Sequence, residues 1–372
     1  MVKIFAMMVV FSLSIWNVSG AAEVSVGKDG GVSLDKYCAQ FEKSAITDKE
    51  YLDQIAREKK EYGISAREIQ TINLYYMKFM NMKTWQVTFV RLPLLREDGQ
   101  VRERVVTRKQ MTMPIDSGVE TKAEFSFIAP NEVRGMKALM FSYYSPDKES
   151  DYWMYMPSLR RIRRISAADR DDSFFGSDCT WADAADIKVD EEKHRIIGVE
   201  KYPVKWDKSI YIEPHPEAWE HVYNKECTAT DESRDDCKGL DHNFSFKSKF
   251  TLAAGKQPRL DNLGPECYVV ESIPQWPTYY AKKITRYHKE HKFALSQDYY
   301  DEKDRHIKYF NRTWIKIGEI PGQAGDYWGI SWWFVHNLLT GHSTFHDIIT
   351  QKANPPLRES DFTQSSMIST GR

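Results

Sequence analysis

Four arginines lie within five consecutive positions, and their type and spacing suit the binding of an anion. Arg160, Arg161, Arg163 and Arg164 surround Ile162. A guanidinium group donates parallel hydrogen bonds that match a phosphate or a carboxylate. Because no motif links a nucleophile or a base to them, we interpret the arginines as a surface that binds an anion or an acidic partner. The alternative is that they form ion pairs with nearby carboxylates, at Asp169, Asp171, Asp172 and Asp178.

Other signs of catalysis or cofactor binding are weak. His342 and His346 have the i, i+4 spacing of helical zinc ligands, yet no acidic third ligand accompanies them as in H-E-x-x-H. The sequence also contains no P-loop, no dinucleotide fingerprint and no G-x-S-x-G motif. We therefore expect a protein that is not an enzyme and that uses no metal and no cofactor.

Aromatic residues make up 13% of the chain and are concentrated in residues 327–334. Alternation along a strand places Trp328 and Trp332 on one side with Phe334. Tyr327 and Trp333 then lie on the other side. One side can meet the sheet core and the other a ligand at the mouth of a groove; the alternative is that helices bury both. The candidate ligand-binding residues of the whole chain are Trp85, Phe89, Trp153, Tyr155, Trp328, Trp332 and Trp333.

The arginines belong to a predicted β-hairpin. Residues 152–156 form an aromatic-rich run, and residues 159–165 form a second run that contains the arginines. Pro157 and Ser158 between them predict a tight turn, because proline presets the φ angle of a turn and cannot donate to a sheet. Each face of the second strand mixes apolar and charged residues, which is typical of a strand at the rim of a sheet.

Elements before and after this hairpin indicate helices followed by a long antiparallel sheet. Thr47-x-x-Glu50 and Ser65-x-x-Glu68 are capping boxes that predict two helices, each apolar along one face. Such helices must pack on a sheet. Alternating segments and turn signals predict the other strands, at residues 83–94, 101–113, 121–128, 137–144, 196–204, 268–273, 281–287, 293–299 and 306–314.

The segment around the hairpin resembles the signature of bacterial periplasmic proteins of the outer-membrane lipoprotein-sorting-like family, in the LolA/LolB-like superfamily. That signature reads W-x-Y-x-P-x-x-R-R-x-R-R and then S-F-x-G-S-D. The chain supplies it with Trp153, Tyr155, Pro157, Arg160, Arg161, Arg163, Arg164, Ser173, Phe174, Gly176, Ser177 and Asp178. It departs from the usual pattern just afterwards, where Cys179 and Ala182 stand in place of an aromatic and an acidic residue.

The resemblance implies an α+β, mainly β fold: a strongly curved antiparallel sheet, or half-open β-barrel, with helices across its concave face. It also implies a non-enzymatic carrier or chaperone that binds the acyl chains of a lipid or lipoprotein during envelope trafficking. An inner-membrane exporter and an outer-membrane acceptor would be its partners. The alternatives are an envelope hydrolase whose arginines orient an anionic group, and an envelope-assembly scaffold whose aromatic segment contacts a protein.

The N-terminus and the charge balance fit an exported protein. Residues 1–22 contain Lys3, an apolar run and small residues, and so predict a cleaved signal peptide and a periplasmic location. Without Lys3 the net charge is about −2, from 51 basic and 53 acidic residues, which argues against nucleic acid as a partner. We expect residues 23–372 to form one domain with an insertion at about residues 206–264.

Five cysteines are an odd number for an oxidising compartment, so at least one has no partner within the chain. Cys227 and Cys237 bracket a short polar loop, and we predict a disulfide between them. Their spacing is not that of a zinc site or a redox dithiol.

Overall fold

The computed structural model describes residues 30–42, 46–98, 100–165, 170–185, 188–203, 263–322 and 325–368. The expected signal peptide, the expected insertion up to residue 262, and both Cys227 and Cys237 lie outside these residues. In the described part, Cys38, Cys179 and Cys267 are buried.

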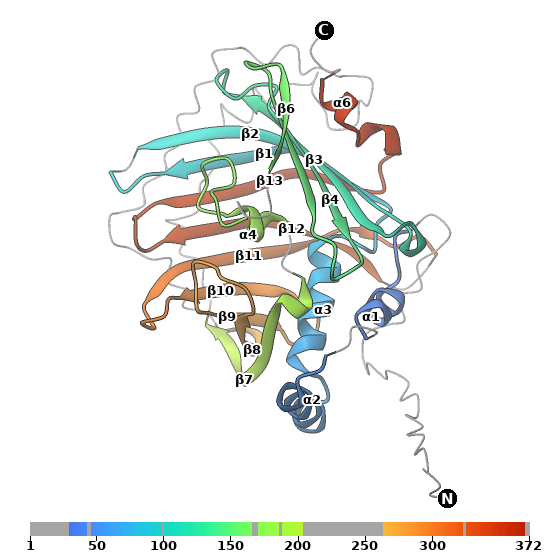
Figure 1. The fold of residues 1–372 in the computed structure, drawn as a ribbon, viewed down its shortest axis with the longest axis vertical. Helices are drawn as coiled ribbons and strands as arrows, with labels where there is room; N and C mark the ends of the chain where they lie inside the picture. Colours follow the sequence, from blue (N-terminus) through green and yellow to red (C-terminus); the bar gives the residue numbers. More distant parts are fainter. Residues whose placement is uncertain are drawn as a thin grey trace, which may run out of the picture.

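The described strands form one antiparallel sheet of 13 strands that is not closed into a barrel. Its order is β6-β5-β4-β3-β2-β1-β13-β12-β11-β10-β9-β8-β7, so the pair β1 and β13 joins the two halves of the chain. The two ends of the sheet bend toward one another (Figure 1). The strands are β1 (Thr84–Leu95), β2 (Val101–Thr112), β3 (Val119–Ala129), β4 (Lys137–Tyr143), β5 (Asp151–Met156), β6 (Arg161–Ile165), β7 (Glu192–Pro203), β8 (Leu263–Pro274), β9 (Lys282–His288), β10 (Ala294–Tyr300), β11 (His306–Glu319), β12 (Asp326–Asn337) and β13 (Ser343–Ala353).

Helices cover the concave face of the sheet. The expected fold class, mainly β with an open antiparallel sheet, is confirmed. α3 (Ala66–Met77) buries Ala66 and Ile69 against residues of β7 to β10 such as Tyr268 and Tyr287. Further along α3, Leu74 and Tyr75 pack against α1 (Leu34–Glu42). Figure 1 shows α3 and the short helix α4 (Trp181–Ala185) between the two ends of the sheet.

α2 (Lys49–Tyr62) binds along β7, which is one edge of the sheet. Glu58 of α2 accepts a hydrogen bond from the backbone N–H of Ile196 at 2.7 Å, and Gln54 donates one to the carbonyl of His194 at 2.9 Å. These contacts satisfy backbone groups that an open edge strand would expose to pairing with another chain.

The capping box at Ser65 and Glu68 is present as predicted, whereas the one at Thr47 was wrong. The N-cap of α2 is Asp48, one residue later, and its carboxylate accepts from the backbone N–H of Tyr51 at 3.1 Å. Aspartate caps a helix as well as threonine does. Asp48 also forms an ion pair with Lys193 at 2.5 Å, which a cap at Thr47 would not provide.

The predicted hairpin is present as β5 and β6, and β6 is an edge strand. The sequence analysis missed α1, α4, α6 (Gln364–Ile368) and β13. α1 and α4 are only nine and five residues long and have weak local signals. β13 contains His346, and its neighbour His342 precedes it, so the helical spacing considered for this histidine pair does not apply in a strand. No described helix has the length and apolarity needed to span a membrane.

Candidate functional site

The concave side of the sheet encloses a segment that we call the inner loop, residues 170–185, which includes α4. Its tip is a tight turn in which the N–H of Ser177 donates to the carbonyl of Phe174 at 3.1 Å. Phe175 and Gly176 occupy the two central positions with φ angles of 53° and 74°. A left-handed conformation at position 176 favours glycine, so the F-x-G-S-D motif specifies the shape of this turn.

Hydrogen bonds attach the tip of the inner loop to the sheet. The N–H of Asp178 donates to the hydroxyl of Thr344 on β13 at 2.8 Å, and the same hydroxyl donates to the Asp178 carboxylate at 2.8 Å. On the other side, the guanidinium of Arg104 on β2 donates to the carbonyl of Phe175. The tip is therefore held by both halves of the sheet.

A buried ion pair attaches the base of the inner loop. The carboxylate of Asp183 lies 2.6 Å from Nζ of Lys308 on β11 and accepts a hydrogen bond from the hydroxyl of Tyr299 at 3.0 Å. Burial alone would raise the pKa of Asp183, but the positive charge and hydrogen bond of Lys308 outweigh it and lower that pKa. Asp183 is therefore ionised at neutral pH.

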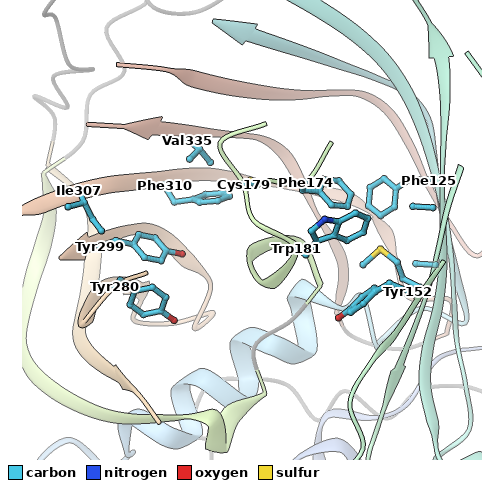
Figure 2. Packing of buried hydrophobic residues seen from close by; sticks show 13 residues of the cluster. Phe125, Tyr152, Phe174, Cys179, Trp181, Tyr280, Tyr299, Ile307, Phe310 and Val335 are labelled. Atoms are coloured by element: carbon cyan, nitrogen blue, oxygen red, sulfur yellow. The ribbon is translucent and has the colours of Figure 1, made fainter. Parts of the chain in front are cut away.

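Aromatic side chains of the inner loop fill the space between the two halves of the sheet. Phe174 packs against Phe125 of β3 and against Trp181, with ring centroids 5.3 Å and 4.8 Å apart. In Figure 2 these rings lie opposite Phe310 and Tyr299. Burying a side chain of this size contributes about 1.5–3 kcal/mol, so the inner loop is part of the core.

Beside the inner loop lies a cavity of about 70 Å³. Its wall combines apolar side chains with five polar ones that come from the inner loop and from β2, β11 and β13. The polar ones are Arg108, Ser177, Asp183, Arg312 and His346. The remaining lining residues are Met77, Leu92, Val106, Phe125, Phe127, Phe174, Cys179, Phe310, Ile330 and Trp333.

Besides Asp183, three titratable groups of the cavity wall have perturbed pKa values. Burial, with the nearby charge of Arg108, lowers the pKa of His346 to about 3, so its ring is neutral at pH 7. Burial lowers the pKa of Arg312 and raises that of the Cys179 thiol. The wall thus presents guanidinium groups, a neutral imidazole and an unreactive thiol.

The predicted aromatic candidates separate into different places. Of the residues in the 327–334 run, Trp333 and Ile330 line the cavity. Trp332 and Phe334 pack in another cluster, with Tyr309 and Phe345. This agrees with the alternation expected for Trp332, Trp333 and Phe334.

Trp328 was expected beside Trp332, but it contacts His291 and Phe293 instead, at centroid distances of 5.0 Å and 5.3 Å. The pairing of β11 with β12 has an irregularity between Ile330 and Trp332, which breaks the alternation.

The other aromatic candidates do not line the cavity. Trp85 is 1% exposed and stacks on Phe79 at 3.9 Å in the core. Phe89 is half-buried where the pairing of β1 with β13 is irregular. Trp153 and Tyr155 pack in a cluster that includes Phe362 and, from α6 (Gln364–Ile368), Met367. The four are thus distributed between core and sheet surface.

The four arginines of the hairpin lie away from the cavity. Arg160 is in the turn, with a φ angle of 48°, and Arg161, Arg163 and Arg164 are exposed on β6. Arg164 forms an ion pair with Asp151. Two of the alternative carboxylate partners are used differently, since Asp171 accepts from Thr278 and Asp178 from Thr344. Asp169 lies outside the described residues.

The sequence analysis did not single out the polar cavity residues Arg108, Asp183 and Arg312. A signal was available for β11, where Lys308 and Arg312 stand at alternate positions with Phe310 and so share one face of the strand. Nothing in the sequence indicated that this face points toward Asp183 and His346, because they come from segments far apart in the chain.

The model of a family described as "Uncharacterized protein" matches residues 120–234 and 246–369. The chain belongs to this family. The comparison with curated proteins gives no match.

Solved structures with the same fold include a domain from Vibrio parahaemolyticus named for outer membrane lipoprotein sorting, with a TM-score of 0.57 and 18% identity over 82% of this chain and 98% of that one. A DUF1329 family protein from Desulfovibrio piger gives a TM-score of 0.56 and 19% identity, over 81% of this chain and 98% of that one. A LolA superfamily protein from Nitrosomonas europaea gives a TM-score of 0.46 and 13% identity, over 82% of this chain and 99% of that one. The first two structures confirm the fold that the LolA/LolB-like resemblance implied.

We expect the turn of the inner loop to depend on Gly176. The Cβ added by Gly176→Ala would lie 3.5 Å from the Arg104 guanidinium, which is an ordinary van der Waals contact. The cost of the substitution is therefore the strain of a φ angle of 74°. That strain is roughly 1–2 kcal/mol, and urea denaturation should show a loss of this size in the free energy of unfolding.

Gly198→Ala on β7 is the matched control, because its added Cβ has open space and its φ angle lies outside the left-handed region. The control should lose no stability. Equal stability of the two variants would contradict the account of the turn.

Proposed function

We propose that the protein is a non-enzymatic periplasmic carrier that holds the acyl chain of a lipid or lipidated protein between the inner loop and the concave face of the sheet. The largely apolar cavity beside the inner loop carries this proposal. Pockets of this kind bind apolar ligands and orient them with a few polar groups. The shared fold with a domain named for lipoprotein sorting supports the same function.

Uptake of an acyl chain requires the inner loop to move. The cavity of about 70 Å³ is smaller than an engineered protein cavity of about 150 Å³ that binds benzene. A chain longer than benzene therefore needs the space that Phe174 and Trp181 now fill. Displacing these rings exposes apolar surface, which the acyl chain then covers.

The chemistry of the cavity favours a carrier over an envelope hydrolase. The raised pKa of Cys179 leaves its thiol protonated, and a protonated thiol is a poor nucleophile. With a pKa of about 3, His346 is a weak general base.

The hairpin arginines provide a surface for a protein partner. Arg160, Arg161 and Arg163 are exposed at the end of the sheet, away from the cavity. An acidic patch on an inner-membrane exporter or an outer-membrane acceptor is a complementary partner.

The pairing of β7 with β8 supports a single domain with an insertion. These strands are neighbours in the sheet, yet residues 204–262 separate them in the sequence. We interpret the intervening segment as an insertion on the same domain.

The pair of neighbouring tryptophans on β12 tests the carrier function. Trp333→Ala should weaken the binding of a fluorescent fatty acyl probe several-fold, because Trp333 lines the cavity. Trp332→Ala is the matched control, since Trp332 packs in the separate cluster with Phe345. It should lower the melting temperature and leave the affinity of the folded protein unchanged.

Equilibrium titration of both variants with the probe, beside thermal unfolding, measures these effects. Equal loss of affinity in the two variants, or none in Trp333→Ala, would count against acyl binding in the cavity.

A further inference from the structure

Within the described part of the chain, two polar side chains in the cavity wall have fewer partners than burial normally requires. Arg312 is 7% exposed, and among the described residues its guanidinium donates one hydrogen bond, to Oε1 of Gln297 at 2.7 Å. A guanidinium has five N–H donors. His346 is also 7% exposed, and its Nδ1 has no hydrogen-bond partner in the described part of the chain. Both side chains line the cavity.

Arg312 and His346 lie in one row across three adjacent strands. Arg312 of β11 is opposite Trp333 of β12, and Trp333 is opposite His346 of β13. Neighbouring strands are about 4.8 Å apart, so the backbones of Arg312 and His346 are separated by roughly 10 Å with Trp333 between them. The Trp333 ring stacks on the His346 ring at 4.4 Å and 11°.

The charges around this row favour an anion in the cavity. Arg312 forms no ion pair with a described residue, and Arg108 brings a second guanidinium to the same cavity. The carboxylate on the cavity wall, Asp183, is already bound by Lys308 and Tyr299. A buried cation without a counter-ion is unfavourable, and an anionic group on a ligand would supply that counter-ion.

We propose that Arg312, Trp333 and His346, together with Arg108, form a subsite for the anionic head group, a carboxylate or a phosphate, of a single-chain amphiphile. The inference rests on the proposed carrier function and adds a substrate class to it. Uncharged acyl esters give the guanidinium groups no counter-ion. The rings of Phe125 and Phe127 then contact the first methylene groups of the chain.

The test compares two ligands with the same chain and different heads. Isothermal titration of the full-length protein with oleate and with methyl oleate should give a Kd for oleate at least tenfold lower. Arg312→Gln should raise the Kd for oleate to that for methyl oleate and leave the latter unchanged. Arg195→Gln is the control, because Arg195 is exposed on β7 and pairs with Glu271. It should bind both ligands as the native protein does.

Two further ligands identify the source of the anion. Oleoyl lysophosphatidic acid binding more tightly than oleate assigns the subsite to a phosphate head, and the reverse order assigns it to a carboxylate. Inorganic phosphate alone should bind weakly, because it brings no chain into the apolar part of the cavity.

Each contrary result has a distinct meaning. Equal affinity for oleate and methyl oleate in the native protein would overturn the head-group subsite and leave the carrier function standing. Failure of both to bind would overturn the carrier function itself. Should Arg312→Gln not fold, the comparison of the two ligands on the native protein still decides, and Arg312→Lys, which keeps the charge, should retain part of the preference for oleate.

Discussion

Lys308→Met should lower the free energy of unfolding by roughly 3–5 kcal/mol, because it leaves the Asp183 carboxylate buried without its cation. The Lys308 and Asp183 side chains are 4% and 2% exposed, and the two groups lie 2.6 Å apart. Methionine keeps most of the volume of lysine, so little of the loss comes from a cavity. The tyrosine rings that now surround the ammonium group, Tyr279 and Tyr299, would remain in place.

Urea denaturation of a double-mutant cycle measures the effect. Adding Asp183→Asn to Lys308→Met should restore part of the lost stability, because the unpaired charge is removed. Lys289→Met is the control, since Lys289 forms an exposed ion pair with Glu266, and it should change stability little. A loss in the single variant no larger than in this control would show that the pair does not fasten the inner loop.

The same ion pair links stability to function. Asp183 is on the inner loop and Lys308 is on the sheet, so weakening the pair favours conformations in which the inner loop is displaced. If uptake needs that displacement, Lys308→Met should load the acyl probe faster while being less stable. Stability and loading therefore change in opposite directions at this contact, which separates it from cavity residues such as Trp333.

The parts of the fold that could be predicted are those specified by residues close together in the sequence. The β5 and β6 hairpin was predicted because alternation and the turn at Pro157 are encoded within 15 residues. The cap of α3 was predicted for the same reason. The cap of α2 was misplaced by one residue because Thr47 and Asp48 are both good caps, and the ion pair that Asp48 forms with Lys193 is not visible in the local sequence.

The cavity was less predictable than the fold. Its residues come from α3, the inner loop and six strands, and only the register of those strands brings Arg312, Trp333 and His346 into one row. Register depends on every turn and irregularity between the strands. The sequence analysis therefore placed Trp332 and Trp333 on opposite faces of their strand but could not tell which of the two faces the cavity.

Asp347 should make the protein less stable as the pH rises from about 4 to about 6. This carboxyl lies on β13 opposite Arg91 of β1, at the strand pair that joins the two halves of the sheet. Burial, with the negative charge of Glu103, raises its pKa from 3.8 to about 6, although Arg91 opposes the shift. In this range the unfolded chain loses its proton while the folded protein keeps it, so ionisation favours unfolding.

The size and sign of this effect can be isolated with Asp347→Asn. A pKa difference of about 2 units corresponds to about 3 kcal/mol, so the free energy of unfolding of the native protein should fall by about that amount relative to the variant between pH 4 and pH 6.5. Most other carboxyl groups have the opposite influence, which is why the difference between the two proteins is the quantity to measure. Urea denaturation at several pH values gives this difference, and ¹³C NMR titration of the Asp347 carboxyl should have its midpoint near pH 6. Parallel stability profiles for the native protein and Asp347→Asn would mean that this carboxyl is ionised in the folded state and that Arg91 outweighs its burial.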